Sequence, residues 1–179
     1  WNTSFIRVFY QNGSGFTNNT YPKPNGGFDE IEIGDMNSDN LNDVVFVSAQ
    51  SYSVHIFTQN ASGMLNNYVS YLPTTPLGTF HDFAIGDLNN DGANDLVISR
   101  GGNSPNAGLL IWFQNTSGSL GTQLNLNAYD IPEAIDIIDF NCDGKPEIYT
   151  ANGGWNAISI YSQDAAGVYG SYQLKFITA

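Results

Sequence analysis

Basic residues are scarce in this sequence. The 179 residues include five Lys and Arg against 17 Asp and Glu, which gives a formal net charge of −12. This balance argues against a nucleic-acid partner, because there is no basic stripe to displace counterions from phosphates. The excess of carboxylates indicates either a merely soluble surface or acidic side chains gathered around cations, and their positions decide between the two.

Long apolar runs and cysteine pairs are also lacking. No stretch approaches the roughly 18 apolar residues that a membrane helix needs, and no secretory signal pattern is visible. The single cysteine, Cys142, cannot form an internal disulfide and assigns the protein to no redox compartment. The apolar fraction of 41% is that of an ordinary globular protein, and the length suffices for one domain with a sizeable core.

Residues that commonly carry catalysis are few. The two histidines, His55 and His81, stand near no recognisable Ser or Cys nucleophile motif, and neither G-x-S-x-G nor H-E-x-x-H occurs. We therefore expect a protein that is not an enzyme, with His81 packed or lining a channel rather than acting as a base.

What the sequence does contain is an internal repeat. An acidic segment occurs three times, at 35–43, 87–95 and 139–147, with its first aspartates 52 residues apart (87 − 35 and 139 − 87). A second motif, close to Gln-Asn-x-Ser-Gly, ends a short apolar run at 8–15, 56–63, 111–118 and 160–167. Two interleaved motifs with a shared period indicate one supersecondary unit copied along the chain.

Each unit has the pattern of four short strands. Segments such as 28–35 and 80–87 alternate apolar and polar residues, β-rich runs follow the acidic segments, and no helical window is convincing. Four antiparallel strands every 50 or so residues are typical of a β-propeller blade. The sequence predicts an all-β fold with a half blade at 4–24 and full blades at 28–73, 80–126 and 132–178. Because propellers close with about four to eight blades, we expect a fragment of a longer protein, or otherwise a self-associating ring of several chains.

The motifs resemble a known family. The pattern F-x-x-x-x-I-G-D-x-N-x-D-G-x-x-D-L-V, followed by I-W-x-Q-N, is similar to the FG-GAP/VCBS repeat, over nearly the whole chain. That repeat builds the propellers of integrin α subunits and of many secreted microbial and lectin-like proteins. The resemblance implies a secreted or cell-surface module for recognition or adhesion.

The acidic loops predict up to three structural calcium ions. Calcium takes six to eight oxygen ligands, and side chains at loop positions 1, 3, 5 and 9 with the carbonyl of position 7 can surround one ion. The expected ligands are Asp35, Asn37, Asp39, Asp43 and the Leu41 carbonyl; Asp87, Asn89, Asp91, Asp95 and the Ala93 carbonyl; and Asp139, Asn141, Asp143, Glu147 and the Lys145 carbonyl. The residues at position 6, Asn40, Gly92 and Gly144, are expected to take a positive φ, which Asn tolerates less easily than Gly.

Other interpretations of these loops remain to be weighed. An EF-hand would need a bidentate Glu at position 12, where Phe46, Ile98 and Thr150 stand, and flanking helices in place of strands. Magnesium prefers tight octahedral geometry and is less suited to the pattern, while Asp/Asn/Gly loops also form metal-free turns. Pro146 and the longer Glu147 make the third loop depart most from the pattern.

The ligand is expected on the face opposite the acidic loops. In a four-strand blade the turns after the second and fourth strands share that face, and loops on a rigid scaffold commonly carry recognition. The candidates there are Tyr52, Arg100, Asn103, Trp155 and Asn156. A protein or a glycan is the expected partner, with a lectin or part of a lyase-like polysaccharide-degrading enzyme as alternatives; Trp155 packing between blades is the competing explanation.

Overall fold

The computed structural model of the protein describes residues 5–24, 27, 29–48, 50–75 and 79–177. Strands and turns make up this part of the chain, with no helix, so the prediction of an all-β fold is confirmed. The strands are β1 (Phe5–Asn12), β2 (Gly15–Pro22), β3 (Glu30–Gly34), β4 (Asp43–Ser48), β5 (Ser53–Phe57), β6 (Val69–Tyr71), β7 (Phe80–Gly86), β8 (Asp95–Arg100), β9 (Gly108–Gln114), β10 (Leu120–Asn127), β11 (Pro132–Ile138), β12 (Glu147–Asn152), β13 (Ala157–Tyr161) and β14 (Gln173–Phe176).

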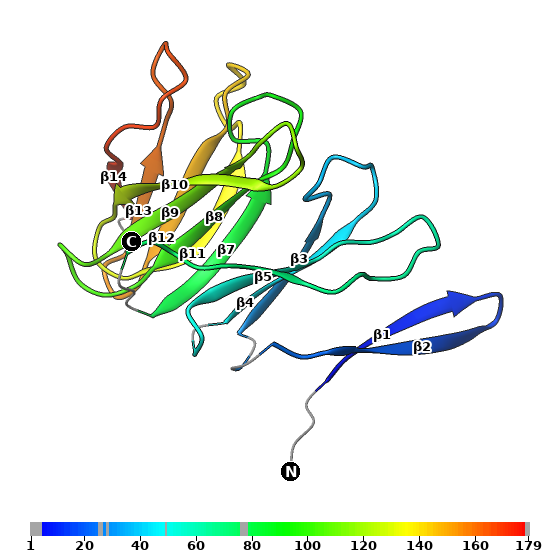
Figure 1. Ribbon diagram of the computed structural model, residues 1–179. Helices are drawn as coiled ribbons and strands as arrows, with labels where there is room; N and C mark the ends of the chain where they lie inside the picture. The colour runs from blue at the N-terminus through cyan, green and yellow to red at the C-terminus, as the bar shows by residue number, and fades with distance from the viewer. Residues whose placement is uncertain (1–4, 25–26, 28, 49, 76–78, 178–179) are drawn as a thin grey trace.

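The strands form three four-stranded antiparallel sheets and one two-stranded hairpin. Sheet 1 has the order β3-β4-β5-β6, sheet 2 β7-β8-β9-β10 and sheet 3 β11-β12-β13-β14, so each is a simple meander. The N-terminal hairpin joins β1 and β2 through the turn at Gly13 and Ser14, with Asn12 paired to Gly15. In Figure 1 the blue hairpin, sheet 1, sheet 2 and sheet 3 follow one another across the molecule in chain order.

Burial along the strands reflects this stacking. β5 and β9 are buried at nearly every position because sheets lie against both of their faces, and they read as continuous apolar runs. β11 alternates buried and exposed residues, because only one face of sheet 3 is covered. The first strands β3, β7 and β11 lie beside one another, so they form the inner edge of the stack.

Three apolar clusters hold the stack together. Sheets 1 and 2 share a core that includes Val45, Ile56, Phe83, Ile98 and Trp112. Sheets 2 and 3 share a second one, with Val97, Ile111, Ile148, Tyr161 and Tyr169, and the N-terminal hairpin packs on sheet 1 through Ile6, Val8, Tyr21, Phe57 and Leu65. The arrangement is propeller-like, and the sheets do not close into a ring within the described residues.

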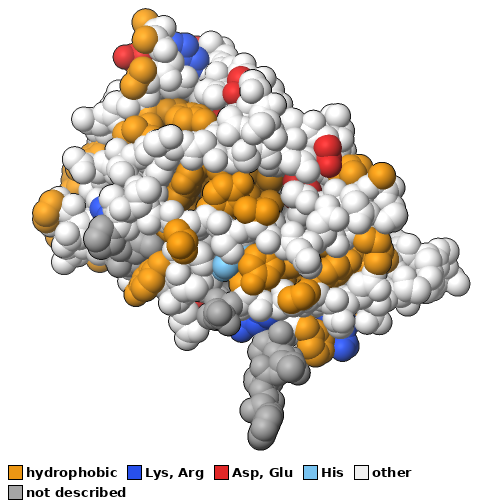
Figure 2. Space-filling model, in the orientation of Figure 1, with side chains coloured by type: hydrophobic (Ala, Val, Ile, Leu, Met, Phe, Trp, Pro, Cys, Tyr) orange, Lys and Arg blue, Asp and Glu red, His pale blue; other side chains and the backbone are white. Residues whose placement is uncertain are grey.

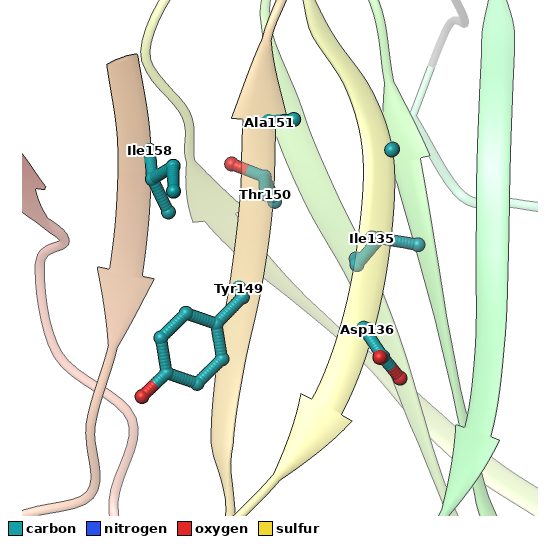
Figure 3. Close-up of a pocket in the computed structure, with 7 residues that line it drawn as sticks. Ile135, Asp136, Tyr149, Thr150, Ala151 and Ile158 are labelled. Carbon is teal, nitrogen blue, oxygen red and sulfur yellow. The ribbon is translucent and has the colours of Figure 1, made fainter. Parts of the chain in front are cut away.

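Both ends of the stack expose apolar surface. Phe5, Phe9 and Phe16 on the hairpin and Ile31 and Ile33 on β3 are exposed. Figure 2 shows hydrophobic side chains gathered in a band across one side of the molecule. At the other end, the uncovered face of sheet 3 has a hollow of about 370 Å³ lined by Tyr149 and Ile158 among others (Figure 3). The described part of the chain contains no helix able to cross a membrane.

Candidate metal-binding loops

The three acidic segments connect the first and second strands of each sheet, as expected. In each, the carboxylate at position 1 is ringed by backbone amides. Asp35 accepts hydrogen bonds from the N–H groups of Asp39 (3.2 Å) and Asn40 (2.8 Å). Asp87 accepts from positions 5 and 6 of its own loop at 3.1 and 2.8 Å, and Asp139 does so at 3.1 and 2.9 Å. The three loops therefore have one backbone conformation.

Positive φ angles shape that conformation at two positions. Position 6 has a φ of 64° at Asn40, 86° at Gly92 and 82° at Gly144, which is the expected region. Position 4 also lies there, at Ser38, Asn90 and Cys142, with φ near 60° in all three. The sequence gave no warning of position 4, because none of these residues is glycine. Cys142 is exposed.

Side chains at positions 3 and 5 already touch. The amide of Asn37 donates to the carboxylate of Asp39 (3.1 Å), and Asn89 and Asn141 donate in the same way to Asp91 (2.9 Å) and Asp143 (3.2 Å). The donor set is oxygen-rich and exposed, which suits a hard cation. In the described residues no group of three or more His, Cys, Asp or Glu side chains is arranged so that it could hold a metal ion. A bound ion would therefore require these side chains to turn away from the backbone amides.

The carboxylate at position 9 lies deepest. Asp43 is buried and accepts hydrogen bonds from Met36 N–H (2.9 Å) and Gln59 N–H (2.7 Å). Asp95 repeats this with Leu88 (2.9 Å) and Gln114 (2.8 Å). This carboxylate therefore ties the start of its loop to the third strand of the same sheet.

The third loop differs at this position. Glu147 is buried, but its longer side chain reaches the Asn141 amide (2.8 Å) and Phe140 N–H (3.2 Å) within its own loop. The departure expected from Glu147 is therefore a change of hydrogen-bond partners.

Burial dominates the electrostatics of position 9. It raises the pKa of Asp95 to about 6, and repulsion from Asp91 and Asp87 adds to that while the two backbone amides oppose it. The pKa of Asp43 is raised for the same reasons, with Asp39 and Asp35 as the repelling neighbours. A divalent cation between these carboxylates would offset the repulsion.

A repeated glutamine joins the loops of neighbouring sheets. Gln114 donates to the Asn94 carbonyl of its own loop (3.0 Å) and accepts from the Ser38 hydroxyl of the preceding one. Gln163 likewise donates to the carbonyls of Leu88 (2.9 Å) and Pro146 (3.4 Å). Sequence reasoning treated the glutamine only as part of a turn, although its recurrence in every unit was the available signal.

The residues proposed for ligand binding lie in loops of three different sheets. Tyr52 is in the β4–β5 turn, Arg100 and Asn103 are at or after the end of β8, and Trp155 and Asn156 are in the β12–β13 turn. Trp155 is half exposed and meets Tyr129 edge to face, with ring centroids 5.9 Å apart. Tyr129 comes from the β10–β11 connection and was not anticipated, because its sequence neighbourhood carries no repeated motif.

His55 has serine partners that its sequence neighbourhood did not identify. It is buried, and its two ring nitrogens lie 2.9 Å from the hydroxyls of Ser53 and Ser70. Burial lowers the pKa of the imidazole. Both nitrogens are used inside the sheet, which is the environment of a structural histidine.

The family described as FG-GAP-like repeat matches residues 35–98 and again residues 87–150. Together these matches cover more than half of the chain, so the protein belongs to the FG-GAP-like repeat family. Each match begins at the first aspartate of an acidic loop and ends in the second strand of the following sheet. The recurring unit thus includes the contact between neighbouring sheets.

A solved structure supports the fold. A protein from Bacteroides fragilis, proposed to be a 6-phosphogluconolactonase, superposes with a TM-score of 0.60 at 22% identity. The match covers 84% of this chain and 39% of that one, so this chain spans about two fifths of that protein. At this identity the likeness concerns the fold alone. No curated protein sequence matches the chain.

Proposed function

We propose that this chain is part of a β-propeller recognition or adhesion module of a secreted or cell-surface protein, and that its acidic loops bind calcium for structural purposes. The observation that carries the proposal is the identical hydrogen-bond frame of three loops, each with exposed oxygen donors at positions 1, 3 and 5. Three unrelated polar turns would have no reason to share it.

Calcium would act through the chain's own ligands. The side chains at positions 1, 3 and 5 and the carbonyl at position 7 would hold the ion, and the buried carboxylate at position 9 would keep the loop attached to its sheet. Nine carboxylates lie in the loops, three in each, and three ions would change the formal charge from −12 to −6. The turn between the first two strands of each sheet would then be stapled in place.

A calcium titration tests this role. Isothermal titration of chelator-treated protein should give up to three sites, with dissociation constants near the roughly 10⁻⁴–10⁻³ M of extracellular modules. At ten times that concentration each site adds about 1.4 kcal/mol to the free energy of unfolding, so the melting temperature rises and EDTA reverses the rise.

Matched variants complete the titration. Asp87→Ala should remove one site and leave the other two, while Asp136→Ala, an exposed carboxylate outside the loops, should keep all of them. A melting temperature that is the same in calcium and EDTA would rule out the metal role.

A glycan ligand is the favoured second possibility, because Trp155 and Tyr129 offer an exposed aromatic pair that could stack on a sugar ring. We expect a glycan array to give hits whose binding falls about tenfold or more in Trp155→Ala. Phe140→Ala, an exposed aromatic residue beside an acidic loop, is the control and should bind as well as the native chain. Hits that ignore Trp155, or binding of proteins alone, would move recognition to another surface or ligand class.

A further inference from the structure

The N-terminal hairpin stands where the third and fourth strands of a full sheet would stand. The Tyr21 hydroxyl accepts a hydrogen bond from Leu65 N–H of sheet 1 (3.1 Å), and Tyr71 of sheet 1 does the same with Leu120 of sheet 2 (3.4 Å). Tyr21 pairs with Ile6 as Tyr71 pairs with Val54. The hairpin therefore docks on sheet 1 in the way that β5 and β6 dock on sheet 2.

One edge of this hairpin lacks its repeat-equivalent neighbour. The strands equivalent to β1 are β5, β9 and β13, and each pairs with strands on both sides. In the described part of the chain, β1 pairs with β2 alone. The missing neighbour corresponds to the second strand of a sheet, such as β4.

The repeat also shows what that edge expects. Gln59 N–H donates to Asp43 (2.7 Å) and Gln114 N–H to Asp95 (2.8 Å), each the position-9 carboxylate of an acidic loop. Gln11 holds the same place in β1. Because successive amides of a strand point to opposite sides, Arg7 and Phe9 direct theirs to the same edge as Gln11.

Beside this edge, sheet 1 has an uncovered apolar strip. Ile31 on β3 is 53% exposed, whereas the equivalent Phe83 and Ile135 on β7 and β11 are 2% and 8% exposed. Those two residues are covered by the first and second strands of the preceding sheet, through the apolar clusters between sheets. Ile33, also on β3, is 61% exposed. We call the β1 edge with Ile31 and Ile33 the strand slot.

We propose that the strand slot binds an antiparallel strand pair with an FG-GAP acidic loop, of the same kind as β3–β4. Its second strand runs antiparallel to β1, its apolar side chains cover Ile31 and Ile33, and its position-9 carboxylate accepts the Gln11 N–H. The argument for this occupant is continuity: the slot adjoins the hairpin–sheet 1 interface, and two complete copies of the same interface exist in the molecule. The inference rests on the repeat geometry and does not depend on calcium.

An extended chain tests the proposal. A further copy of residues 80–100, the strand pair of sheet 2, is placed directly before residue 1 of the full chain. The four residues 1–4 then precede β1, as residues 49–52 lie between β4 and β5. Hydrogen exchange should slow by about an order of magnitude or more at the amides of Arg7, Phe9 and Gln11, and the melting temperature should rise.

Three variants of the extended chain identify the contacts. Asp95→Ala in the added copy alone should restore fast exchange at Gln11. Ile31→Ser should abolish the gain in melting temperature, whereas Phe176→Ser, an exposed aromatic residue on β14, should keep it.

Two outcomes would overturn the proposal. The first is unchanged exchange at the β1 amides in the extended chain. The second is a dimer of the native chain, seen by light scattering, in which these amides are already protected, since a second copy would then fill the slot. All measurements are repeated in EDTA: protection that persists there supports the slot even if the calcium titration fails, so the two proposals are tested separately.

Discussion

At the scale of single residues, burial and charge repulsion create the least ordinary groups. Glu30 on β3 lies against Asp82 on β7, at equivalent positions of neighbouring sheets, and Asp82 accepts the Ile135 N–H of the next sheet (2.8 Å). Burial and the hydrogen bond and repulsion of Asp82, with Glu32 nearby, raise the pKa of Glu30 to about 7. Carboxylates thus act as links between the inner strands of the stack.

This link predicts a pH dependence of stability. Because the pKa of Glu30 is raised above its ordinary value of 4.5 on folding, the folded chain binds the extra proton between about pH 4.5 and 7. The stabilisation is complete below that window and is lost as the pH rises through it. Glu30→Gln, which remains neutral, should flatten the slope of unfolding free energy between pH 5 and 7 in urea titrations.

The exposed glutamate Glu133 provides the control for this prediction. Glu133→Gln should leave the slope of the native chain in place. If Glu30→Gln has the native slope as well, the pair does not share a proton.

Residue-scale features also mark where sequence reasoning stopped. The positive φ at Ser38, Asn90 and Cys142 could not be predicted, because local hydrogen bonds to the position-1 carboxylate impose it on residues that do not require it. The pairing of Trp155 with Tyr129 depends on two loops that only the packing of sheets 2 and 3 brings together.

At the scale of elements, the acidic loop and the Gln-containing turn form one device. Each loop is closed by its own carboxylates and then fastened to the next sheet by the glutamine of that sheet. Period and spacing predicted the strands and the loops, because both follow from local alternation and turn chemistry. The fastening between sheets could not be predicted, because it joins residues 75 or more positions apart.

The glutamine can be tested against its own repeat. Gln114→Ala removes hydrogen bonds to Asn94 and Ser38 and leaves a buried carbonyl without its donor, so it should lower the free energy of unfolding by about 1–3 kcal/mol. Gln11→Ala changes the equivalent but exposed residue and should shift stability by about 0.5 kcal/mol or less. Urea denaturation of both variants measures the difference; equal effects would mean that Gln114 joins nothing of consequence.

At the scale of the whole molecule, the ends of the stack are unlike its middle. Phe9 is 60% exposed, whereas the aromatic residues at its repeat position, Phe57, Trp112 and Tyr161, are 0%, 3% and 0% exposed. Those three face a preceding sheet, and Phe9 has none before it in the described chain. At the far end, Tyr149 borders the open hollow of Figure 3, while the equivalent Val45 and Val97 are fully buried under the next sheet. Residues selected for a core are therefore exposed at both ends of the stack.

The sequence by itself determined the fold class, the repeat and the chemistry of its loops. These follow from period-two alternation, from oxygen-bearing residues at fixed spacing and from turn residues, all of which act over a few neighbours. Only the tertiary structure decided which carboxylates are buried, which glutamines join neighbouring sheets and where a strand pair is missing beside β1. Such properties depend on what lies across the next sheet, and a residue such as Ile31 carries no local sign that its cover is absent.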